Sequence, residues 1–206
     1  MDILSQLIEQ IRTQNWIDWT VTITALIYVL LAARENIWCW FWGIISCSLW
    51  AYASFAFYHL WMDALLQLFY VAMAIVGWYQ WRRGESEGEI RTTTHLTAGE
   101  HILYTAILFP TTFLFGYFFS EYTEAAATYP DAFTTILSII ATLVLVQKKL
   151  ETWLYWVLAD ALYVWLYARQ GAYLFSLLMI IYVIIAADAY FRWKKQMKSE
   201  AAMQGE

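Results

Sequence analysis

Seven long apolar runs, separated by short polar segments, dominate the hydropathy pattern of this 206-residue chain. A helix that crosses a bilayer needs about 20 predominantly apolar residues, and each run is close to that length. The pattern therefore predicts an all-α integral membrane protein with seven transmembrane helices. The predicted spans are residues 16–33, 37–58, 60–81, 101–120, 131–147, 152–169 and 172–191.

Three segments outside these runs differ in character. Residues 1–15 place apolar side chains at helical spacing among polar ones, which predicts an amphipathic helix lying on the membrane surface. Residues 82–100 hold three glycines and mixed charges and are expected to form a cytoplasmic linker. Residues 194–206 are polar and are expected to form a cytoplasmic tail.

Composition supports a membrane location. Hydrophobic residues make up 62% of the chain and charged residues 14%, whereas soluble domains average about 45–50% and about 25%. Such a composition excludes an ordinary soluble enzyme. The only two cysteines, Cys39 and Cys47, lie in one apolar run, which favours buried thiols over a disulfide.

The basic residues divide unevenly between the two sides of the predicted topology. Lys and Arg collect on the cytoplasmic side of membrane proteins, so the side that holds ten of the twelve is the cytoplasm. A multi-pass protein of a bacterial inner membrane is expected, with its N-terminus outside and its C-terminus in the cytoplasm. The ten residues are Arg34, Arg82, Arg83, Arg91, Lys148, Lys149, Arg192, Lys194, Lys195 and Lys198.

Similar residues recur in the two halves of the chain. We interpret this as two parallel three-helix repeats, residues 16–81 and 131–193, connected by an inverting helix over residues 101–120 that Pro110 bends. The predicted fold is a 3+1+3 arrangement, and such symmetry places a substrate site between the repeats near the bilayer midplane. The matched pairs, at offsets of 112–114 residues, are Ser46 with Asp160, Trp42 with Trp156, Tyr70 with Tyr182, Trp81 with Trp193 and Asp18 with Asp131.

Asp160 is the residue most indicative of a site. It lies about nine residues, or roughly 13 Å, into its predicted span, and an acid at that depth costs about 2.5–3.5 kcal/mol on insertion scales. It is expected to attract a cationic substrate or a proton; the alternative is a structural acid bonded to neighbouring helices. Trp156 and Tyr163 share its helical face, where aromatic rings suit a flat cation but could equally pack between helices.

Five further residues are candidates for substrate binding. Trp42 and Ser46 are the repeat-mates of Trp156 and Asp160, and the amide of Gln67 lies three residues before Tyr70 near mid-membrane. Tyr182 is the repeat-mate of Tyr70. For these residues an interhelical contact is the alternative to a role in binding.

Motifs for other chemistry are absent. The chain has no phosphate-binding GxxxxGK[ST] loop, no metal-ligand spacing among His59, His95, His101 and the cysteines, and no hydrolase constellation. We therefore expect a transporter without cofactor, metal or nucleic-acid partner, and not an enzyme. Its expected partners are a small-molecule substrate and membrane lipid.

Two segments carry a resemblance to a known family. Arg34–Trp81 contains RENIWCWFWGIISCSLW and LLQLFYVAMAIVGWYQW, and Asp131–Trp193 contains DAFTTILSIIATLVLVQKKLETWLYWVLADALYVWLY. They resemble the PnuC family of bacterial vitamin transporters, most specifically at the GWYxW ending of Gly77–Trp81. The resemblance implies a SWEET-like 3+1+3 fold and a homo-oligomer, suspected to be a trimer. It also implies facilitated diffusion of nicotinamide riboside, thiamine or riboflavin, with trapping by a cytoplasmic vitamin kinase.

One departure from the family pattern concerns the substrate. Nicotinamide riboside members often carry ENWxxW…N in the sixth helix, where this chain has ETWLYW and Asp160, with Thr152 after Glu151. Thiamine and nicotinamide riboside are both cationic and suit an acid, and the exchange gives thiamine a slight preference; neutral riboflavin fits less well. A proton-coupled symporter that uses Asp160 and a non-transporting membrane vitamin receptor are the alternative functions.

Overall fold

The structure, a computed structural model, describes residues 3–86, 92–122 and 128–204. These residues form eight helices, most of which are long apolar runs. The helices are α1 (Ile3–Thr13), α2 (Trp16–Ala32), α3 (Trp38–Ala56), α4 (Trp61–Ser86), α5 (Ala98–Tyr122), α6 (Thr128–Val146), α7 (Thr152–Arg169) and α8 (Tyr173–Gln204).

Several of these helices can cross a membrane. Five of them in the described part of the chain (α3, α4, α5, α6 and α8) are long and apolar enough, and α1 with α2, bent by 102°, can form a sixth span. Helix α7 is not among them because it combines six Trp and Tyr side chains with Asp160 and Arg169. The protein is a multi-pass all-helical membrane protein, but the seven predicted spans are not confirmed by this criterion.

Two helices run further than the apolar pattern indicates. Helix α4 continues to Ser86, so the first residues of the predicted 82–100 linker are helical. Helix α8 continues to Gln204, so residues 194–204 of the predicted tail form its last turns. Lys, Glu, Met and Ala are good helix formers, and the helix therefore continues after its apolar stretch ends. The middle of the linker, residues 87–91, lies outside the described residues.

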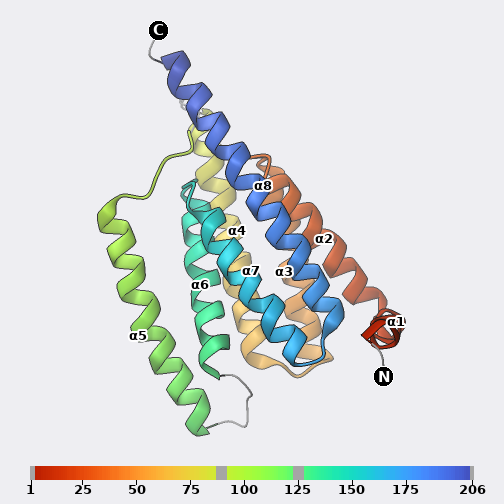
Figure 1. The fold of residues 1–206 in the computed structure, drawn as a ribbon. Helices are drawn as coiled ribbons and strands as arrows, with labels where there is room; N and C mark the ends of the chain where they lie inside the picture. Colours follow the sequence, from red (N-terminus) through yellow and green to blue (C-terminus); the bar gives the residue numbers. More distant parts are fainter. Residues whose placement is uncertain (1–2, 87–91, 123–127, 205–206) are drawn as a thin grey trace.

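The long helices pack in two groups that meet along the centre (Figure 1). Helices α2, α3 and α4 pack in chain order, as do α6, α7 and α8. The groups join where α4 contacts α6 and α2 contacts α8, whereas α5 contacts only α6 among the described helices. Helix α1 turns sharply away from α2 and lies against α8.

Four tryptophans form the core at the end of the bundle that holds the C-terminus. Trp40 meets Trp81 edge to face with ring centres 5.2 Å apart, and Trp153 meets Trp193 in the same way at 5.4 Å. The Trp81 and Trp193 rings also touch, at 6.0 Å. A Cβ atom at Gly77 would lie 2.5 Å from the Trp40 ring, so glycine is required for α4 to approach this closely.

The turns α2–α3 and α6–α7 lie at the same end and have the same backbone conformation. Each contains one non-glycine residue in the left-handed region, Glu35 at φ 53° and Lys148 at φ 59°. Their positions differ by 113 residues, and equivalent backbone hydrogen bonds close the two turns. These bonds run from Glu35 N to Ala32 O and Lys148 N to Leu145 O, and from Asn36 N to Leu31 O and Lys149 N to Val144 O.

Candidate functional site: a central aromatic cavity

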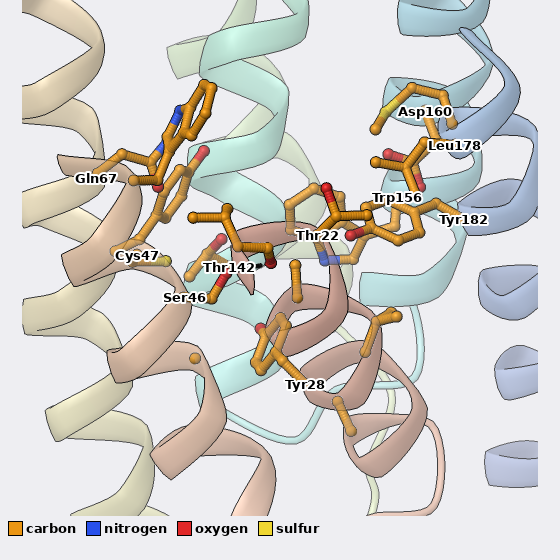
Figure 2. A pocket seen from close by; sticks show the side chains of 18 of the residues that line it. Thr22, Tyr28, Ser46, Cys47, Gln67, Thr142, Trp156, Asp160, Leu178 and Tyr182 are labelled. Atoms are coloured by element: carbon orange, nitrogen blue, oxygen red, sulfur yellow. Dashed lines mark hydrogen bonds between the residues drawn. The ribbon is translucent and has the colours of Figure 1, made fainter. Parts of the chain in front are cut away.

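A cavity of about 330 Å³ lies between the two groups of helices (Figure 2). Every long helix except α5 contributes to its lining. At one end it reaches Gln14 and Asp18, near the start of α2, and at the other it reaches Trp40 and Trp153 of the tryptophan core. This volume falls in the lower part of the range of about 300–1,000 Å³ that ligand pockets occupy.

The structure brings together most of the residues that the sequence singled out. In Figure 2, Asp160, Trp156 and Tyr182 gather on one side of the cavity and Gln67 lies on the opposite side. Their convergence from different helices on one cavity is a finding, whereas their role in substrate binding stays a prediction. The predicted residues that line the cavity are Ser46, Gln67, Tyr70, Trp156, Asp160 and Tyr182.

Trp42 does not line the cavity. Its ring meets Phe41 edge to face at 5.8 Å, and the stripe of α3 that faces the cavity is instead Gly43, Ser46, Cys47 and Trp50. Each residue turns a helix by about 100°, so Trp42 points away from that stripe. The sequence comparison paired Trp42 with Trp156 at an offset of 114 residues. Trp40 and Trp153 are instead 113 residues apart, and that offset pairs Trp156 with Gly43, which does line the cavity.

Tyr163 is also absent from the cavity lining. It stacks on Tyr167, with ring centres 5.7 Å apart and planes 15° apart, and it lies beside Thr134 and Ser138 of α6. Tyr167, four residues later, lines the cavity in its place. Tyr163 does lie on the same face of α7 as Trp156 and Asp160, but at the edge of this face, where α6 packs against it.

Asp160 is the most deeply placed charge in the cavity. It is 4% exposed and occupies the ninth position of the 18-residue helix α7. None of the ion pairs formed by the described residues includes it. Neither Lys, Arg nor His appears among the described residues that line the cavity, so a bound cation would supply the only positive charge near this carboxylate.

Two hydroxyl groups of the cavity are already bonded within the protein. Ser46 Oγ donates to Val21 O at 3.3 Å, and Thr142 Oγ1 donates to Ser138 O at 2.9 Å. These hydroxyls satisfy backbone carbonyls of their own or neighbouring helices, as is common in membrane helices. Ser46 therefore has a structural role even though it lines the cavity.

At the end near α1, Asp18 is held by neighbours. Tyr58 donates its hydroxyl to Asp18 Oδ1 at 2.6 Å, and Asn15 N donates to Asp18 Oδ2 at 3.1 Å within the capping box of α2. Loss of hydration raises the pKa of Tyr58, and its hydrogen bond to Asp18 raises it further. Asp18 thus lines the mouth of the cavity as a bonded carboxylate.

Several lining residues were not predicted. The periodicity of α3 could have revealed Cys47 and Trp50, which lie one and four residues beyond Ser46. Trp153 lies 113 residues after Trp40, so a comparison of the two halves at that offset could have paired these two lining residues. No signal in the sequence distinguishes Tyr28, which lies against Gly43 because that residue has no side chain: a Cβ there would be 3.1 Å from the Tyr28 ring.

A multi-pass helical bundle with one buried acid in a central aromatic cavity defines a membrane protein that holds a small molecule. A family model described as nicotinamide mononucleotide transporter matches residues 15–195. The chain belongs to this family, the PnuC family of membrane transporters.

Two curated relatives and one solved structure show the extent of the similarity. The nicotinamide riboside transporter PnuC of Escherichia coli K12 is 30% identical over 204 residues, which cover 87% of this chain and 85% of the relative. The riboflavin/roseoflavin transporter RibM of Streptomyces davaonensis is 30% identical over 178 residues, covering 84% and 80%. A crystal structure of the vitamin B3 transporter PnuC has the same fold, with TM-score 0.72, 24% identity and coverage of 96% of this chain and 90% of that one.

Proposed function

We propose that this protein transports a cationic heteroaromatic vitamin across the membrane by facilitated diffusion, and that Asp160 balances the charge of the vitamin. One observation carries the proposal: a buried carboxylate faces a cavity with aromatic walls, and the described residues that line this cavity include no basic side chain. A desolvated cation gains electrostatic energy from such rings and from the acid together. Trp156 and Tyr182 lie on the same side of the cavity as Asp160 and are the rings proposed to contact the ligand.

The lining favours an unphosphorylated substrate. A nucleotide phosphate is normally held by Arg, Lys or helix N-termini, and none of these basic side chains is among the described lining residues. Asp18 and Asp160 would repel a phosphate. We therefore propose the riboside and not the mononucleotide as the nicotinamide substrate of this chain.

Among vitamins, nicotinamide riboside has the best support. The E. coli relative named above and a Neisseria mucosa relative, 26% identical over 196 residues, are both named as its transporters. Thiamine, which the sequence slightly favoured, is the second candidate because Asp160 would suit either cation. Riboflavin is neutral and larger, and it matches both the acid and the cavity of about 330 Å³ less well.

The proposed topology is the 3+1+3 arrangement. Support comes from the two turns with left-handed residues 113 positions apart, from their equivalent hydrogen bonds and from the paired tryptophan contacts. The repeats would be residues 16–81 and 131–193, with residues 101–120 as the connecting span. The basic residues favour a cytoplasmic C-terminus and an N-terminus outside, with residues 1–15 on the outer surface.

Net uptake requires a sink for the vitamin. The chain has no P-loop motif, so we propose that a cytoplasmic vitamin kinase traps the substrate by phosphorylation. A homo-oligomer, a trimer by family resemblance, is part of the proposal, and cross-linking in native membranes would test it.

Binding titrations on purified protein test the substrate. Nicotinamide riboside, thiamine, riboflavin and nicotinamide mononucleotide are titrated against the same preparation and followed by calorimetry. We expect the riboside to bind most tightly and the mononucleotide to bind weakest among the nicotinamide compounds. Preferential binding of the mononucleotide or of riboflavin would refute the role given to Asp160. Accumulation above the external concentration that depends on a proton gradient would refute facilitated diffusion and support a symporter.

A further inference from the structure

An ion pair that the proposed transport cycle leaves without a role lies beside Trp81, whose ring touches the cavity-lining Trp40. Lys148 Nζ lies 2.9 Å from Glu35 Oε2, and the two side chains are 12% and 6% exposed. Lys148 Nζ also lies 5.2 Å from the centre of the Trp81 ring. The pair therefore connects the α2–α3 turn to the α6–α7 turn directly beside the tryptophan core.

The positions of the two charges follow from the backbone of the turns. Glu35 and Lys148 are the residues in the left-handed region, which non-glycine residues rarely adopt and which is found at functional sites. A glycine would fit this conformation better in each turn. That both turns instead carry a long charged residue, with opposite signs, indicates that the contact between them is required.

Residues between α4 and α5 form hydrogen bonds to both of these turns. Thr94 N donates to Lys148 O at 3.2 Å, and Leu150 N donates to Thr94 O at 2.9 Å. Thr93 Oγ1 donates to Glu35 Oε1 at 3.3 Å. Thr93 and Thr94 thus contact both turns at once, and we call residues 93–96 the strap.

The strap is also fixed further along. Leu96 N donates to Glu151 Oε2 at 2.9 Å, and His95 Nδ1 lies 2.7 Å from Glu151 Oε1. Lys149 Nζ donates to His95 O at 3.2 Å. These contacts hold the strap on the α6–α7 turn, so separation of Glu35 from Lys148 also breaks the bond from Thr93 to Glu35 on the α2–α3 side.

We propose that the Glu35–Lys148 ion pair is the inner gate of the transporter, that it closes the cavity over Trp40, Trp81, Trp153 and Trp193, and that the strap limits its opening. The cavity lining includes Trp40 and Trp153, and Trp40 touches Trp81, the ring that lies against Lys148. A vitamin bound near Asp160 leaves toward the C-terminal side only when the turns separate. The gate rests on the proposed transport function.

Cys39 provides a native reporter of opening. It is 0% exposed and packs in the same core as Trp40, one residue before it. In a Cys47→Ser background, a membrane-impermeant maleimide is applied to inverted vesicles, which expose the C-terminal side if the proposed orientation holds, and separately to intact cells. Labelling of Cys39 then measures how often the gate opens.

Neutralising the pair should increase that labelling. We expect Glu35→Gln to label about tenfold faster or more from the C-terminal side, because a neutral amide attracts the Lys148 ammonium less strongly than the carboxylate does. The charge-swapped double variant Glu35→Lys with Lys148→Glu should return toward the parent rate. Asp188→Asn, which removes the exposed pair with Arg192, is the matched control and should label at the parent rate.

Glu35→Gly separates gating from folding. Glycine relieves the left-handed backbone while it removes the charge, so this variant should be folded and still label fast. Unchanged labelling in both Glu35 variants would overturn the gate, as would fast labelling only in variants that elute as unfolded or aggregated protein. The assay contains no vitamin, so its result is independent of the titrations that test the substrate.

Discussion

Replacing Asp160 with asparagine tests the charge of the proposed site with little change in shape. The carboxylate is 4% exposed and has no ion-pair partner among the described residues. The other cavity acid, Asp18, is the third residue of α2, whereas Asp160 is the ninth of the 18 residues of α7. Asp18 is also bonded to Tyr58 and cannot replace the missing charge.

The magnitude follows from Coulomb's law. Two unit charges about 5 Å apart at an effective dielectric constant of about 20 attract with about 3 kcal/mol. Part of that energy is offset because the amide still accepts hydrogen bonds and because the buried carboxylate no longer has to be desolvated. A net loss of about 1.4–2.8 kcal/mol weakens binding of a cationic vitamin about ten- to hundredfold.

The assay compares two forms of one ligand. Nicotinamide riboside carries a cationic ring, and its reduced dihydro form carries a neutral ring of nearly the same shape. Calorimetric titration of both forms against wild type and Asp160→Asn should show the loss for the cationic form only. Asp188→Asn, on the outside of α8, is the matched control. Equal loss for both forms, or no loss for either, would refute the electrostatic reasoning.

Two further predictions concern the aromatic wall and the core. Trp156→Ala should weaken vitamin binding about tenfold by removing a cation–π contact. Trp165→Ala, on the exposed side of the same helix, is the control and should leave the binding titration unchanged. Equal effects of the two substitutions would show that Trp156 is not part of the site. Gly77→Ala should cost about 1–3 kcal/mol and lower the melting temperature in detergent, because the new Cβ would overlap the Trp40 ring. Gly99→Ala, which meets nothing within 4 Å, should melt like the parent, and a similar fall in both variants would contradict the packing argument.

Hydropathy predicted the long helices well because membrane spans are specified by composition. It was less reliable where a helix contains polar or charged residues. Helix α7 carries Asp160, Arg169 and many rings, so it fails an apolar test although it packs between α6 and α8. Helix α8 continues beyond its apolar stretch because nothing in residues 194–204 stops a helix.

Some of the residues that line the cavity could be predicted from helical geometry, and others could not. Helical periodicity from Asp160 correctly placed Trp156 on the cavity, because residues four apart share a face. An error of one residue in the repeat offset placed Trp42 there wrongly. The Glu35–Lys148 contact could not be predicted from periodicity, because it joins two turns and depends on how the two groups of helices face each other.

Counterflow in proteoliposomes tests the central claim most directly. Vesicles that contain the purified protein are loaded with unlabelled nicotinamide riboside and diluted into a trace of the labelled compound, without a pH gradient. The proposed function predicts a transient rise of label inside the vesicles, fast in wild type and slowed in Asp160→Asn. Vesicles that bind the vitamin but show no counterflow would contradict transport and identify the protein as a receptor.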